Sequence, residues 1–231
     1  MTHADIDRHA PGTRHYASSR MTHAERTDLS DTLMFEAAVK LIVERGTEKT
    51  TLKDVGEMAG YSRGLAGYRF GSKSGLLSYV IKRVGDSWSQ ELRQVTQGKT
   101  GFEAIAASID AHYRFCVDAP VTRRAFYLLW FDAAGTTSEV RESMLKIHER
   151  RQQDVEQWVK DGINDGSVRA DVDPEAVARL FLATVIGILY QWLMQPEAMD
   201  AVEQLHNNLK QTMYVLLRDT TSQHKLGEIN A

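Results

Sequence analysis

Residues 50–77 read TTLKDVGEMAGYSRGLAGYRFGSKSGLL, and they are the most informative part of the sequence. A helix that begins near Thr51 is expected to end at Gly60, since glycine suits the left-handed backbone of a tight turn. Ser62 then offers a side-chain oxygen that can cap a second helix, which ends before Gly71. Two short helices joined in this way predict a helix-turn-helix, a motif whose second helix can enter the major groove of DNA.

The second helix of this motif has the character of a DNA-reading helix. Arg63 stands at its start, and the small residues Gly64, Ala66 and Gly67 let a backbone come close to DNA. Residues 58–85 contain five basic residues and no aspartate or glutamate. Contacts to phosphates supply much of the affinity of proteins for DNA, and an acid-free surface favours them.

The segment Gly71–Ser74 begins the next helix and invites comparison with a phosphate-binding loop. Free backbone N–H groups, a hydroxyl group and the ammonium group of Lys73 converge there, which suits a DNA phosphate. A nucleotide-binding P-loop is excluded, because that motif requires glycine where Ser72 stands and follows a strand.

Helical spacing of apolar residues continues through most of the chain, and no sustained alternation predicts a strand. We expect about nine helices, over residues 30–45, 51–59, 62–70, 73–97, 103–116, 122–133, 138–165, 174–196 and 199–218. Asp173 followed by Pro174 is a particularly clear helix start. The predicted class is all-α, with a three-helix DNA-binding domain at residues 28–75 and a helical bundle at residues 76–220. Polar stretches at 1–27 and 221–231 predict a disordered tail at each end.

Composition narrows the class of protein. The 231 residues are 42% hydrophobic and 26% charged, as in ordinary globular proteins. The single cysteine, Cys116, excludes a disulfide framework and favours a reduced, cytoplasmic setting. No signal peptide is evident, and the apolar stretch 180–194 is too short for a membrane span. The net charge of −3 divides into +1 for residues 1–20, +2 for 21–85 and −6 for the rest, so the acidic total does not argue against DNA.

Residues 30–83 resemble the DNA-binding domain of the tetracycline-repressor (TetR) family. The matching segments are Phe35–Ala38 (FEAA), Glu44–Gly46 (ERG), Thr50–Val55 (TTLKDV), Ala59–Gly64 (AGYSRG) and Tyr68–Lys73 (YRFGSK). The resemblance implies a nine-helix plan, with a C-terminal domain that binds a ligand and forms a dimer.

The resemblance also assigns roles within the motif. It places Thr51 and Lys73 at positions that hold phosphates, and Arg63, Gly64 and Leu65 at positions that face bases. Ser62, Tyr68 and Arg69 complete the expected DNA-binding set. Members of the family often have tyrosine at the position of Gly67 and histidine at that of Arg69. Two alternatives stay open here: Tyr68 and Phe70 as core aromatics, and Arg69 as a solvated charge.

The C-terminal domain is expected to provide the dimer interface and a ligand pocket. The last two helices are the most apolar pair with a short connection, and two such pairs can form a four-helix bundle between subunits. Aromatic residues of the middle helices predict an apolar pocket. Its candidates are His112, Tyr113, Cys116, Phe126, Tyr127, Trp130, Phe131 and Trp158. No metal site and no cofactor are expected.

These features predict a homodimeric transcriptional regulator, most simply a repressor that a small molecule releases from a palindromic operator. A palindrome has two half-sites about one helical turn apart, and each half-site binds one recognition helix. Two copies of the chain are therefore expected to bind together as a dimer. The alternative is a DNA-binding protein of the same fold that a protein partner controls, or that has an architectural role. An enzyme is not expected, since no constellation of acid, base and nucleophile is evident.

Overall fold

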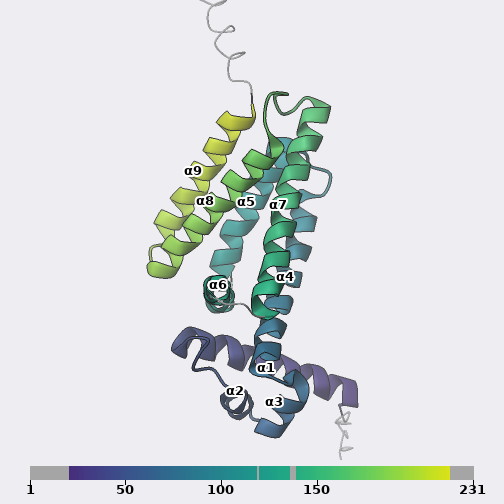
Figure 1. The fold of residues 1–231 in the computed structure, drawn as a ribbon, viewed down its shortest axis with the longest axis vertical. Coiled ribbons are helices and arrows are strands. Elements are labelled where there is room, and N and C mark those ends of the chain that lie inside the picture. The colour runs from purple at the N-terminus through teal and green to yellow at the C-terminus, as the bar shows by residue number, and fades with distance from the viewer. Residues whose placement is uncertain (1–20, 119, 136–138, 219–231) are drawn as a thin grey trace, which may run out of the picture.

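The computed structural model describes residues 21–118, 120–135 and 139–218, and within these ranges the chain forms nine α-helices and no strand (Figure 1). The helices are α1 (His23–Arg45), α2 (Leu52–Met58), α3 (Arg63–Phe70), α4 (Lys73–Thr96), α5 (Gly101–Asp118), α6 (Pro120–Ala134), α7 (Glu139–Asp165), α8 (Pro174–Met194) and α9 (Met199–Leu217). The predicted all-α class is confirmed.

Helix α1 begins earlier than expected, which corrects the N-terminal tail of 1–27. The Thr22 hydroxyl accepts a hydrogen bond from the backbone N–H of Glu25 (3.2 Å), and the Thr22 N–H donates to the Glu25 carboxylate (2.6 Å). This reciprocal capping box begins the helix at His23. Residues 23–27 are therefore helical, while residues 1–20 and the expected tail 221–231 lie outside the described residues.

Helix α4 connects the two parts of the molecule without a break. It has 24 residues, so the domain boundary expected between residues 75 and 76 falls within its first turn. Figure 1 shows α4 rising from the layer of α1–α3 into the bundle of α5–α9. Its buried residues Leu76, Val80 and Val84 belong to one hydrophobic core that extends from α1 to α9. The two domains therefore share a helix and a core.

Glycines bring α5 and α7 into close contact. A Cβ atom on Gly162 would lie 2.6 Å from the Cα of Gly101, and 2.5 Å from a methyl group of Val168. Real Cβ atoms do not approach backbone atoms this closely, so this crossing requires a residue without a side chain.

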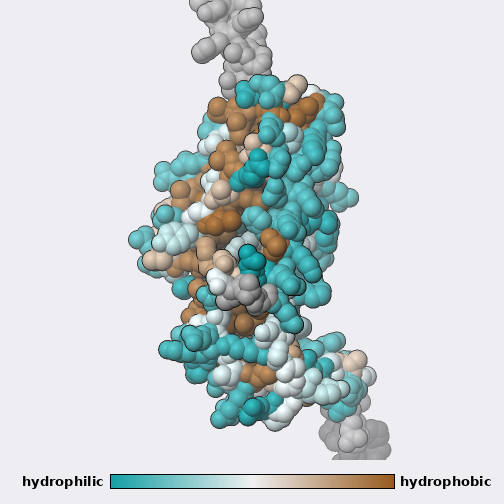
Figure 2. All heavy atoms as spheres, in the orientation of Figure 1, coloured by the Kyte–Doolittle hydropathy of each residue, from teal (hydrophilic) through white to brown (hydrophobic). Residues whose placement is uncertain are grey.

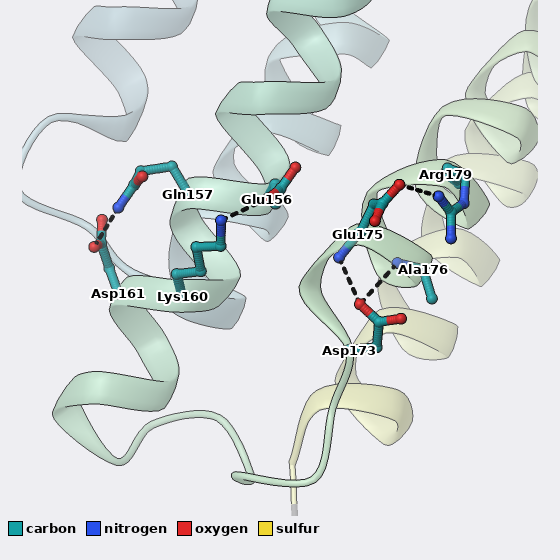
Figure 3. A network of polar contacts seen from close by, with 8 residues as sticks. All are labelled: Glu156, Gln157, Lys160, Asp161, Asp173, Glu175, Ala176 and Arg179. Carbon is teal, nitrogen blue, oxygen red and sulfur yellow. Dashed lines mark hydrogen bonds and ion pairs between the residues drawn. The ribbon is translucent and has the colours of Figure 1, made fainter.

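The start of α8 follows the predicted signal. The Asp173 carboxylate accepts hydrogen bonds from the N–H groups of Glu175 (3.0 Å) and Ala176 (3.4 Å), and Pro174 occupies the first turn (Figure 3). Pairs four residues apart, Glu156 with Lys160 and Glu175 with Arg179, lie on the surfaces of α7 and α8 (Figure 3). The apolar stretch 180–194 was expected to be too short for a membrane span, but by length and composition the whole of α8 is a candidate span, the one found among the described residues, with 39% of its apolar window buried inside the protein.

Two histidines are buried between α5 and α9. The ring atoms His112 Nδ1 and His206 Nε2 are 2.8 Å apart, and His206 Nδ1 lies 2.7 Å from the carbonyl oxygen of Val202. Because a carbonyl only accepts, His206 Nδ1 donates to it, and His206 Nε2 accepts the proton of His112 Nδ1. His112 Nε2 then accepts from the Tyr127 hydroxyl at 3.1 Å. Every imidazole nitrogen is satisfied while both rings are neutral.

We predict that Gly162→Ala lowers the free energy of unfolding by about 1–3 kcal/mol, since α5 and α7 must separate to admit the methyl group. Gly67→Ala is the matched control, because a Cβ atom there meets nothing within 4 Å. That change should leave stability equal or raise it by up to about 1 kcal/mol. Urea unfolding followed by circular dichroism measures both; equal stability of the two variants would contradict the prediction.

The buried histidines predict a loss of stability in weak acid. Burial lowers the pKa of His112 from 6.5 to about 3, with a smaller contribution from His206, and burial also lowers the pKa of His206. The unfolded chain therefore binds more protons below about pH 6.5, and for His112 the stability falls by up to about 1.4 kcal/mol per pH unit as the pH drops from about 6.5 toward 3. His112→Gln should flatten the dependence of the urea midpoint on pH between about 7 and 5. An unchanged slope for His112→Gln would argue against this assignment.

Candidate DNA-binding surface and ligand cavity

Helices α2 and α3 form the predicted helix-turn-helix. Gly60 adopts the positive φ of 78° that the turn needs, and the Tyr61 N–H donates to the Gly56 carbonyl at 2.7 Å. Ser62 caps α3 by accepting from the Leu65 N–H at 3.2 Å. A Cβ atom on Gly56 would lie 2.9 Å from the Ser62 carbonyl oxygen. Gly56 therefore lets the two helices touch, a role that the sequence reading missed.

Helix α3 has an exposed side and a side that packs on the core. Ser62, Arg63, Gly64 and Tyr68 are exposed, with Tyr68 at 84%. This exposure answers the open question about Tyr68, which is not a core aromatic. Leu65 is half-buried against the core, so only part of its side chain is available. Phe70 does pack inward, with its ring centroid 5.2 Å from that of Tyr79.

The basic residues of the acid-free stretch differ in what they contact. Arg69 lies against α1, with Nε 3.5 Å from the Asp31 carboxylate and Nη2 3.4 Å from the Ser30 hydroxyl. Arg83 stacks on Phe35 at 4.4 Å and also bonds α1. Arg69, expected at the DNA, is instead a brace between α3 and α1.

Three basic residues remain. Lys82 pairs with the exposed carboxylate of Asp86, and Lys73 Nζ donates to the Glu48 carbonyl in the loop between α1 and α2. Arg63 alone of the five has no hydrogen bond or ion pair among the described residues. A guanidinium group at the start of an exposed α3, with all its donors free, is poised to bind an external acceptor.

Thr51 lies at the N-terminus of α2 and caps it, accepting from the Asp54 N–H at 3.2 Å. Its hydroxyl also donates to the Asp54 carboxylate at 2.7 Å. At the start of α4, Ser72 accepts from the Gly75 N–H at 3.0 Å. The expected phosphate-binding residues Thr51 and Lys73 thus stand at two different helix N-termini, where helix dipoles favour an anion.

A cavity lies within the C-terminal bundle, between α4, α5, α6, α7 and α8. Its walls are mostly apolar, with Ser108, His112, Tyr127, His148 and Arg151 as polar members. The lining residues are Trp88, Leu92, Ser108, His112, Phe115, Phe126, Tyr127, Trp130, Phe131, Ile147, His148, Arg151, Val155, Trp158, Phe181, Leu182, Val185, Ile186 and Leu189. An apolar cleft with a few polar groups has the character of a small-molecule site.

The structure brings most of the predicted pocket residues together. His112, Phe126, Tyr127, Trp130, Phe131 and Trp158 line the cavity, whereas Tyr113 and Cys116 do not. Tyr113 lies one position from His112 on α5 and turns toward α9, where its hydroxyl is 3.3 Å from the Glu203 carboxylate. Cys116 is fully buried, and burial raises the pKa of its thiol to about 12. Cys116 acts as a small core residue.

Arg151 is the functional candidate that the sequence reading missed. It stands on the inward face of α7 with Ile147, Val155 and Trp158, at helical spacing. A lone charge in such an apolar row was the signal that could have found it. Among the described residues no cluster of histidine, cysteine, aspartate or glutamate suited to a metal ion is found.

Family models match both parts of the chain. Residues 35–80 match the model for bacterial regulatory proteins of the tetR family, and residues 106–212 match the C-terminal domain of BetI-type transcriptional repressors. The chain is similar to the HTH-type transcriptional repressor KstR2 of Rhodococcus jostii, with 25% identity over 84% of this chain and 92% of that protein.

Solved structures share the fold. The transcriptional regulator FadR of Bacillus subtilis in complex with stearoyl-CoA matches with a TM-score of 0.69 and 17% identity, over 81% of this chain and all of that one. SmeT, the repressor of a multidrug efflux pump of Stenotrophomonas maltophilia, matches in its complex with triclosan with a TM-score of 0.68 and 20% identity, over 83% and 93%. With the helix-turn-helix, the nine helices and both family models in agreement, this chain belongs to the tetR family of bacterial transcriptional regulators.

Proposed function

We propose that the protein is a homodimeric repressor in the cytoplasm that binds a palindromic operator and leaves it when a small molecule enters the cavity. Arg63 carries this proposal. Among the five basic residues of the acid-free stretch 58–85, Arg63 is the one that no other described residue contacts through a hydrogen bond or ion pair. It stands at the start of α3, where side chains of a recognition helix reach base edges. Ser62, Gly64, Leu65 and Tyr68 flank it. Thr51 and Lys73 would hold phosphates on either side.

The cavity supports control by a small molecule. Its aromatic walls offer a large apolar area, and its position beside α4 connects it to the reading domain. Proteins with the same fold are known in complex with triclosan and with stearoyl-CoA. A ligand shifts the DNA-binding equilibrium only as far as it prefers one arrangement of α4 over another.

The outer faces of α8 and α9 support a dimer. On α8 the exposed residues Leu180, Ala183, Gly187, Tyr190 and Met194 follow helical spacing and carry no charge. On α9 the exposed residues Ala201, Gln204, Asn208, Gln211 and Val215 do the same. Figure 2 shows hydrophobic residues gathered on the surface of the C-terminal domain. A large uncharged face on two adjacent helices suits a four-helix interface between subunits.

Selection of bound fragments from a random DNA pool should yield a palindrome with half-sites about one helical turn apart. Arg63→Ala should flatten the preference at one or two positions of each half-site, at a cost of about 1–3 kcal/mol for the selected sequence. Lys73→Ala should weaken all sequences alike and reduce the salt dependence of binding.

Lys53→Ala is the control, since Lys53 lies on the exposed surface of α2, paired with Glu57. It should leave the selected sequence unchanged. Recovery of no palindrome would overturn the proposed operator. An Arg63→Ala protein with the wild-type preference would remove Arg63 from base reading.

We predict that Gly187→Lys yields a monomer of 26.0 kDa, whereas the wild type elutes at about twice that mass. A Cβ atom at Gly187 meets nothing within 4 Å, so the subunit itself accepts the change. Gln157→Lys, on the exposed surface of α7, adds the same charge away from α8 and α9 and should remain dimeric. Light scattering after size exclusion measures the mass; a dimeric Gly187→Lys protein would place the interface elsewhere.

A further inference from the structure

Arg151 is largely buried at the edge of the cavity, and two of its three guanidinium nitrogens have no partner among the described residues. Its side chain is 14% exposed. Nη2 bonds the Asp154 carboxylate at 3.1 Å and the Ser89 hydroxyl at 3.4 Å. Nε and Nη1, both buried, have no hydrogen-bond partner among the described residues. Buried charged donors without partners are costly, so a built site of this kind points to a missing acceptor.

The local charge favours an anion as that acceptor. Asp154 is shared, because its other carboxylate oxygen lies 3.2 Å from Nε of Arg150. One carboxylate thus faces two guanidinium groups, and a positive charge remains. The cavity lining contains no aspartate or glutamate to compensate it. His112 is neutral and bonded on both ring nitrogens, so it offers no charge and no free donor.

The rest of the cavity selects an apolar body. Nine apolar side chains from α5, α6 and α8 line the cavity together with Arg151, and so do Trp88 of α4 and Trp158 of α7. The Tyr127 hydroxyl gives its proton to His112, so toward a ligand it presents only oxygen lone pairs. An all-hydrocarbon ligand would offer Arg151 no hydrogen-bond acceptor. A fully polar ligand would make no apolar contact with the walls and would lose its own hydrogen bonds to water.

We propose that the ligand is an amphipathic acid, with an anionic group of carboxylate type bound to Nε and Nη1 of Arg151 and an apolar body among the aromatic rings. This assignment deepens the proposed function and rests on it. A charge-assisted hydrogen bond in a site shielded from water discriminates strongly against a neutral analogue.

Three probes of equal chain length test the assignment: dodecanoate, 1-dodecanol and dodecyltrimethylammonium, each below its micelle concentration. Tryptophan fluorescence reports binding, since Trp88, Trp130 and Trp158 line the cavity. The full-length wild type should bind dodecanoate at least about tenfold more tightly than dodecanol, and the cation most weakly. Arg151→Met should abolish the preference for dodecanoate and leave the affinity for dodecanol unchanged.

Arg150→Met is the matched control. Arg150 bonds the same Asp154, but its side chain is 65% exposed and does not line the cavity. This variant should keep the wild-type preference. Arg151→Lys retains the positive charge but changes the arrangement of its donors. This variant should keep part of the preference for dodecanoate over dodecanol, which distinguishes an effect of charge from misfolding. Equal binding of dodecanoate and dodecanol by the wild type, an undiminished preference in Arg151→Met, or no binding of any probe would overturn the proposal.

Release of the selected DNA, followed by fluorescence anisotropy, separates this proposal from the proposed function. If dodecanol releases DNA as well as dodecanoate does, from both the wild type and Arg151→Met, the proposal that the ligand is an acid is overturned. The proposal that a small molecule releases the protein from DNA would still stand. Binding of dodecanoate that depends on Arg151 but releases no DNA would support the acid-binding site and contradict release by the ligand.

Discussion

Helix α4 runs without a break from the DNA-binding domain into the C-terminal bundle, and its continuity fixes how the two parts are placed. Lys73, in its first turn, bonds the loop that precedes α2. Its middle residues pack in the common core, and Trp88 and Leu92 line the cavity. No flexible linker separates the cavity wall from the DNA-binding domain. A displacement of either one therefore involves the same helix, α4. We propose that ligand binding and DNA binding are coupled through this helix, because a packed core does not deform continuously.

The wall of the cavity is mostly apolar, and its buried polar groups are of two kinds: those with all their hydrogen-bond partners and those without. In the histidine pair of α5 and α9 every ring nitrogen has a hydrogen-bond partner. The Val202 carbonyl fixes the tautomer of His206, His206 in turn fixes that of His112, and His112 accepts from the Tyr127 hydroxyl. Arg151 is incomplete, with two buried nitrogens unpaired. The first arrangement stabilises the fold, whereas the second gives the cavity a chemical preference. Burial alone would not distinguish them; the hydrogen-bond partners do.

Charge counts describe the reading surface only partly. The acid-free stretch of residues 58–85 contains five basic residues, of which Arg63, Arg69 and Lys73 are expected at the DNA. In the structure Arg69 and Arg83 instead brace α1, Lys82 pairs with Asp86, and Lys73 bonds a carbonyl group. The absence of acids in this stretch still matters, since it leaves Arg63 without a competitor nearby in sequence. One free guanidinium group at a helix start is a more specific feature than a basic patch.

The amino-acid sequence is enough to predict the helical class, the helix-turn-helix with its turn at Gly60, the cap of α8 at Asp173 and the aromatic character of the pocket. These features depend on local conformation, capping and periodicity, which act over a few residues and are legible in order along the chain. The early start of α1 was equally local, since the capping box of Thr22 and Glu25 stands in the sequence.

Contacts between side chains of different helices follow from the packing of the helices and cannot be predicted from the helical pattern. This packing placed His112 in the cavity but the adjacent Tyr113 against α9, buried Cys116 away from the cavity, turned Arg69 toward Asp31, and set Arg151 among aromatic rings. Each of these outcomes depends on the rotation of one helix against another. A rotation of one position, about 100°, exchanges a lining residue for its neighbour without changing the helical pattern of the sequence.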